Sequence, residues 1–148
     1  MKQTILAILI SVIIPVAAFS SEGGEESEGA TNFGEGKAVT AFGKEEGFKL
    51  SQKAMQNLGV EFSTVKTDGP WTVPSGAIVH LKQSSGVYRK VDGWISFVLV
   101  KVVNKAGATV SIQSADLQAG DEVAIRGATF LRMTDADLNA GTVDSCAH

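Results

Sequence analysis

The sequence predicts an all-β protein, a small β-barrel or sandwich of about seven short strands with one short N-terminal helix. Three observations lead to this prediction. Between residues 60 and 126, apolar side chains recur mostly at every second position, which is the period of a half-buried strand. Turn-forming residues, above all Asp92-Gly93, separate these segments. Just before them, residues 51–58 carry apolar side chains at helical spacing.

The predicted helix is followed directly in the sequence by the first predicted strand. Ser51 is a good N-cap for a helix over residues 52–58, and Gly59 suits the position just past its C-terminal end. Pro74 marks a bend or a sheet edge. Strands are expected over residues 60–65, 71–73, 76–81, 87–91, 94–103, 109–114 and 122–126.

The run over residues 94–103 differs from the other predicted strands. It is apolar on both faces except at Ser96 and Lys101, so we expect a central and deeply buried strand. The structure of residues 128–133 is ambiguous from the sequence. The folded domain is expected over residues 48–134, followed by a polar C-terminal tail over residues 135–148.

The charge of the 148-residue chain is unevenly placed. Residues 1–20 hold one charged side chain, Lys2, and residues 21–47 hold seven Glu against two Lys. Residues 48–148 hold ten Lys or Arg against nine Asp or Glu, although the whole chain carries a net charge of −3. The near-neutral domain lacks the basic face that phosphate binding needs, so we expect no nucleic acid partner.

The N-terminus is typical of an export signal. Lys2 precedes an apolar run over residues 5–19 that is short for a membrane span, and small residues follow that run. We therefore expect residues 1–20 to be a signal peptide and the mature chain to lie in the periplasm. No cysteine lies near the expected cleavage point, so no covalent membrane anchor is expected. An uncleaved membrane anchor is the alternative.

Residues 21–47 are rich in Glu, Gly and Ser and show no apolar period. Such a segment buries too little apolar surface to offset the entropy lost on ordering. We expect a flexible acidic linker.

Two segments of the expected domain carry motifs. Residues 48–65 read FKLSQKAMQNLGVEFSTV, and the return segment includes VPSGAIV at residues 73–79 and LQAGDEV at residues 117–123. Gly120 and Asp121 supply a tight turn in that return, and Gly127 ends its last strand. Together these segments resemble the membrane-proximal domain of periplasmic adaptor subunits, or membrane fusion proteins, of RND-type efflux pumps. The heavy-metal efflux branch is the most similar.

The resemblance implies a particular partner. In that family a lipoyl domain and a long α-helical hairpin separate the two segments, whereas here only residues 66–72 lie between them. The chain thus resembles an isolated membrane-proximal domain, which docks on an RND inner-membrane pump or a full-length adaptor but cannot bridge two membranes. A remnant of a longer adaptor is the alternative that the same resemblance allows.

Side chains suited to catalysis or metal binding are few. His80 has no nucleophile at a recognisable spacing, and the carboxylates fall mostly in turns, so we expect no enzyme and no cofactor. Cys146 is the single cysteine and can form no internal disulfide. With His148 it offers thiolate and imidazole ligands for Cu(I) or Zn(II), although a structural zinc site uses four ligands. A small envelope metal-binding protein that uses this tail is the alternative function.

Overall fold

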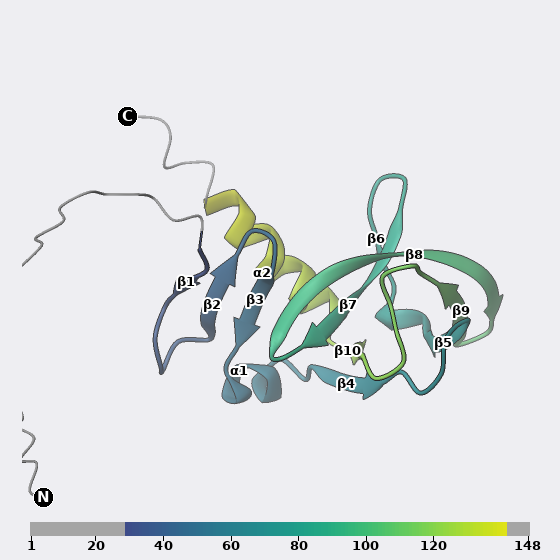
Figure 1. Ribbon diagram of the computed structural model, residues 1–148, viewed down its shortest axis with the longest axis horizontal. Helices are drawn as coiled ribbons and strands as arrows, with labels where there is room; N and C mark the ends of the chain where they lie inside the picture. The colour runs from purple at the N-terminus through teal and green to yellow at the C-terminus, as the bar shows by residue number, and fades with distance from the viewer. Residues whose placement is uncertain (1–28, 142–148) are drawn as a thin grey trace, which may run out of the picture.

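The computed structural model describes residues 29–141, and β-strand is the predominant regular structure in this part, which confirms the all-β fold class (Figure 1). The helices are α1 at Gln52–Asn57, a single 3-10 turn η1 at Ser75–Ala77, and α2 at Ala128–Gly141. The strands are β1 Thr31–Asn32, β2 Val39–Gly43, β3 Gly47–Leu50, β4 Glu61–Thr64, β5 Trp71–Pro74, β6 Val79–His80, β7 Ser85–Val91, β8 Trp94–Ala106, β9 Thr109–Gln113 and β10 Glu122–Arg126.

Helix α1 lies where the sequence predicts a helix. The Ser51 hydroxyl accepts a hydrogen bond from the Ala54 N–H at 3.2 Å, which confirms the predicted N-cap. Leu58 is the C-cap, and Gly59 follows it with a φ of +60°. The predicted helix and strand over residues 51–65 therefore form as α1 and β4.

Strand β8 is the longest strand and joins two parts of the sheet, arching across the molecule in Figure 1. Its first half pairs antiparallel with β7, and its second half pairs with β9. Beyond β7 lie β10 and β4, and beyond β9 lies β5, so six strands follow one another in the order β4-β10-β7-β8-β9-β5. The long, arching strand β8 thereby belongs to both parts of the sheet.

The central strands bury side chains on both faces, because successive residues of a strand point to opposite sides. The inner core contains Val87, Val98, Val100 and Val123 with residues of β5, β9 and the loops, including Trp71, Val73, Val110, Ile112 and Leu117. The outer core contains Tyr88, Ile95 and Ala124 under residues of β2, β3, α1 and α2, including Phe42, Phe48, Ala54 and Leu131. Tyr88 makes edge-to-face contacts with Phe48 and Phe97, at ring-centroid distances of 6.3 and 5.5 Å.

The hairpin between β7 and β8 forms at the predicted turn. Val91 pairs with Trp94, and the two turn residues Asp92 and Gly93 have φ values of +50° and +82°. A two-residue hairpin loop with positive φ at both positions is the type I′ geometry that Asp-Gly favours.

The expected flexible linker over residues 21–47 is wrong from residue 31 onward. Strand β1 pairs with β2, β2 pairs with β3, and Phe42 is buried in the outer core. This burial depends on β3 lying beside β8, where Phe48 pairs with Ile95. The sequence pattern cannot show that contact, because the two residues are far apart in the chain. Residues 21–28 and the expected signal peptide lie outside the described residues.

The expected polar tail is also wrong as far as residue 141. Residues 128–141 form α2, which buries Ala128 and Leu131 against the sheet. The predicted strand over residues 76–81 forms only in part: its first two residues belong to η1, and only β6 pairs with β7. None of the helices between residues 29 and 141 is long and apolar enough to cross a membrane.

The expectation of a deeply buried strand over residues 94–103 holds only in part. Ile95, Val98 and Val100 are buried, but the side chains of Leu99 and Val103 are 56 % and 51 % exposed. The strand is central in its pairing, yet its outward-facing apolar residues extend past the elements that cover Tyr88 and Ile95. These exposed residues form an apolar surface on β8.

Candidate functional site

The exposed part of β8 presents apolar side chains beside a charged one. Leu99 and Val103 are exposed, and the exposed Lys101 lies between them. The pairing with β9 shifts between Val102 and Asn104, which leaves Val103 without a partner residue in β9. We name Leu99, Lys101 and Val103 the β8 surface.

An open hollow lies on each side of the β8 surface. One, of about 730 Å³, is lined by residues 99–101 together with Trp71, Gln113 and Leu117. The other, of about 530 Å³, is lined by residues 99–102 together with the β6–β7 hairpin, including His80 and Leu81. Both hollows are shallow and open to solvent, so they suit the side chains of a macromolecular partner better than an enclosed small molecule.

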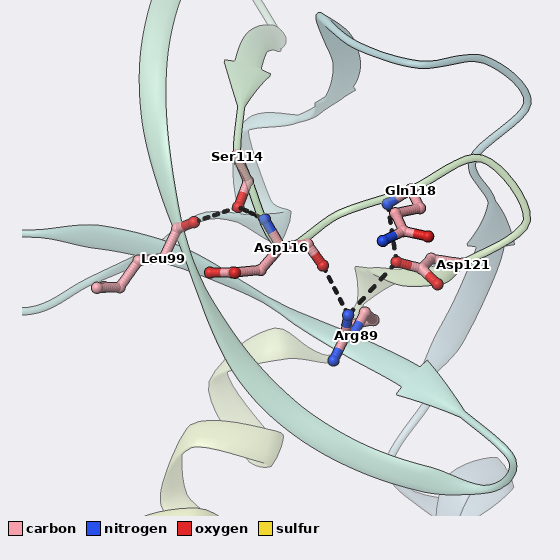
Figure 2. A network of polar contacts seen from close by, with 6 residues as sticks. All are labelled: Arg89, Leu99, Ser114, Asp116, Gln118 and Asp121. Carbon is pink, nitrogen blue, oxygen red and sulfur yellow. Dashed lines mark hydrogen bonds and ion pairs between the residues drawn. The ribbon is translucent and has the colours of Figure 1, made fainter.

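The loop over residues 114–121 borders the first hollow. Figure 2 shows that Arg89 contacts two residues of this loop, Asp116 and Asp121. Nη1 of Arg89 donates to the Asp116 carbonyl at 2.6 Å and lies 3.6 Å from Oδ2 of Asp121. Oδ2 of Asp121 also accepts from the Gln118 N–H at 3.0 Å. Arg89 therefore holds both ends of the Asp116–Asp121 turn from the neighbouring strand β7.

Two further contacts join this loop to the sheet. The Ser114 hydroxyl donates to the Leu99 carbonyl at 2.7 Å and accepts from the Asp116 N–H at 3.2 Å (Figure 2). On the other side, the Gly120 N–H donates to the Val65 carbonyl at 2.8 Å, and the Val65 N–H donates to the Asp121 carbonyl at 2.8 Å. These hydrogen bonds hold the loop in one position, so it forms a fixed rim of the first hollow.

The turn residues of this rim are predicted from the sequence, but Arg89 is not. Gly120, with a φ of +99°, and Asp121 form the predicted tight turn. The signal for Arg89 was a charged residue at an inward-facing position of a strand, two residues after the buried Val87. Such a residue needs a polar partner, and here the backbone of the loop provides it.

The other predicted structural residues lie away from the β8 surface. Ser51 caps α1, and Pro74 ends β5, which is an edge strand among the described strands. Gly127 lies just before α2 and close to Gly59. A Cβ added at Gly127 would contact Val60 and the Gly59 carbonyl. These residues support the fold and are not brought into one site.

A hydrogen bond in the outer core fixes the position of α2. The buried Tyr88 hydroxyl donates to Oδ2 of Asp135 at 2.8 Å, and Nη1 of Arg132 lies 3.9 Å from the same oxygen. Burial raises the pKa of Tyr88 above its ordinary value of 10.0, and the neighbouring Asp135 carboxylate adds to this shift. The hydroxyl stays protonated and acts as a structural donor.

The proposed metal ligands Cys146 and His148 lie outside the described residues. Within residues 29–141, no three His, Cys, Asp or Glu side chains form a group that could hold a metal ion. His80 is exposed, and its Nδ1 lies 2.9 Å from the Ser85 hydroxyl at the base of the β6–β7 hairpin.

No family model matches the chain, and no curated protein or solved structure matches it either.

Proposed function

We propose that the chain is an exported, adaptor-like docking domain that binds an RND inner-membrane pump or its full-length adaptor in the periplasm. It has no catalytic activity of its own and modulates efflux, and the resemblance points to metal ions as the transported class. The observation that carries this proposal is the β8 surface, where Leu99 and Val103 are exposed on a central strand.

Exposed aliphatic side chains on a rigid strand favour a protein partner. Burying apolar surface stabilises a complex by about 25 cal/mol per Å² before the costs of association. The hollows on either side of Leu99 can accept partner side chains, and the loop fixed by Arg89 gives the partner a preformed rim. A rigid surface binds with a smaller entropic cost than one that orders on contact.

The motif on which the resemblance partly depends lies beside the β8 surface. The LQAGDEV motif of residues 117–123, on which the resemblance partly depends, supplies Leu117 to the hollow and Asp121 to the rim. Its location beside the β8 surface supports a role in docking. Because the domain is small, we expect at most a standard-sized interface and a modest affinity.

Co-purification with a matched pair of variants tests the proposal. A tagged full-length chain would be expressed in bacteria that contain a heavy-metal RND pump and its adaptor, then crosslinked and recovered from the envelope. We expect the pump or adaptor in the recovered material, and a strong reduction for Val103→Glu. Met133→Glu is the control, because Met133 is 58 % exposed but lies on α2.

Two results would count against the docking function. One is the absence of any pump or adaptor component from the recovered material in cells that express both. The other is an equal reduction in recovery for Val103→Glu and Met133→Glu, which would show that the association does not depend on the β8 surface.

A further inference from the structure

We propose that the partner is held by strand addition: an extended acidic segment of the pump or adaptor pairs with the open edge of β8 at Phe97 and Leu99. This inference rests on the proposed docking function and names the way in which the partner binds. It follows from the pairing of β8, the direction of its backbone groups and the chemistry beside them.

One edge of β8 is fully paired and the other is interrupted. On the first edge, β7 pairs with every residue from Trp94 to Val100. On the second edge, β3 pairs with Ile95 and β9 pairs from Lys101 onward. Within the part of the chain that the structure describes, no strand pairs with residues 96–100 on this second edge. Unpaired strand edges of this kind are templates for another strand.

The backbone of Leu99 faces this open edge. The Ser114 hydroxyl donates to the Leu99 carbonyl, and Ser114 follows β9, so the carbonyl points away from β7. In an antiparallel strand the N–H and C=O of one residue point to the same side, and alternate residues share that side. The N–H and C=O of Phe97 therefore also face the gap. Because the Leu99 carbonyl already accepts from Ser114, the backbone groups left for an added strand are the Leu99 N–H and the N–H and C=O of Phe97.

The surroundings of the gap indicate the chemistry of the segment. The hollow of about 730 Å³ begins beside Leu99 and gives room for an incoming chain. The exposed Leu99 side chain can pack against an apolar residue of that chain. Lys101 is exposed and is in no ion pair among the described residues, so a carboxylate beside it would complement its charge.

Two substitutions at one position test strand addition. Leu99→Pro removes the outward N–H and the side chain, while Leu99→Ala removes most of the side chain and keeps the N–H. Pro is tolerated on a strand edge where the N–H faces solvent. The affinity of each full-length variant would be measured for the purified adaptor or solubilised pump recovered by co-purification. We expect Leu99→Pro to bind roughly five- to tenfold more weakly than Leu99→Ala, as for the loss of one hydrogen bond.

Amide hydrogen exchange of the unmodified chain gives an answer even if Leu99→Pro fails to fold. In the free protein the Leu99 amide should exchange faster than the amides of Val98 and Val100, which face β7. Addition of the partner should protect the Leu99 amide.

The possible outcomes separate the two proposals. Partner binding with no protection of Leu99, or with equal affinities for Leu99→Pro and Leu99→Ala, overturns strand addition and leaves docking in place. Protection of Leu99 by self-association of the chain alone also overturns it, because the occupant is then a second copy. Failure to recover the pump or adaptor overturns both proposals.

Discussion

At the scale of single residues, Gly86 of β7 shows how tightly the outer face of the sheet is packed. A Cβ at this position would overlap the Phe97 ring and the Val98 carbonyl. We predict that Gly86→Ala lowers the free energy of unfolding by about 1–3 kcal/mol, because Phe97 must move away from Tyr88. Gly76→Ala is the matched control, since its Cβ would meet no atom within 4 Å. Urea unfolding of both variants is the measurement, and equal stabilities would contradict the packing described.

The raised pKa of Tyr88 leads to a prediction about how the stability of the protein depends on pH. Its pKa is raised in the folded protein, so the unfolded chain releases this proton first as the pH rises above about 10. The stabilising contribution is therefore complete below pH 10 and is lost at more alkaline pH. We predict that Tyr88→Phe costs about 1–2 kcal/mol at neutral pH and that the cost shrinks above pH 10. Thermal unfolding across this range checks it, and a cost that stays constant or grows would contradict the assignment.

Residues with local roles could be predicted from the sequence, and residues with distant partners could not. Ser51 acts on an N–H three residues away, and Asp92-Gly93 forms its turn by itself. By contrast, Arg89 reaches a carbonyl 27 residues away, and Tyr88 reaches a carboxylate 47 residues away. A local pattern of residue types contains no information about such pairs.

At the scale of elements, β8 combines a core strand with an interaction surface. Val100 points into the inner core, whereas its neighbour Leu99 is exposed. We predict that Val100→Ala lowers the free energy of unfolding by about 1–3 kcal/mol and that Leu99→Ala changes it by less than about 0.5 kcal/mol. Chemical denaturation of the two variants is the measurement. A large loss of stability for Leu99→Ala would show that this side chain belongs to the core.

The helix α2 could not be predicted from the sequence. Only Ala128 and Leu131 of its fourteen residues are buried, so the apolar stripe that faces the sheet is narrow. Its position depends on Leu131 entering the outer core and on the hydrogen bond between Tyr88 and Asp135. Tertiary contacts, more than helix propensity or amphipathic pattern, explain why residues 128–141 fold as they do.

At the scale of the whole molecule, one sheet supports two cores and leaves part of its longest strand uncovered. The alternation of residues 60–126 predicted the sheet, because most of its strands bury side chains on at least one face. The pattern could not show which apolar residues of β8 would be covered, since that depends on where α2 and the β2–β3 hairpin lie. The apolar residues left outside, Leu99 and Val103, are those on which the proposed function depends.

Site-specific photocrosslinking tests that function most directly. A benzoylphenylalanine placed at Val103 or at Met133 samples two exposed apolar positions, one on the β8 surface and one on α2. In cells that express a heavy-metal RND pump and its adaptor, we predict a crosslink from position 103 to one of these proteins and none from position 133. Mass spectrometry of the crosslinked species would identify the partner. A crosslink to neither protein from position 103, or the same crosslinks from both positions, would contradict docking through β8.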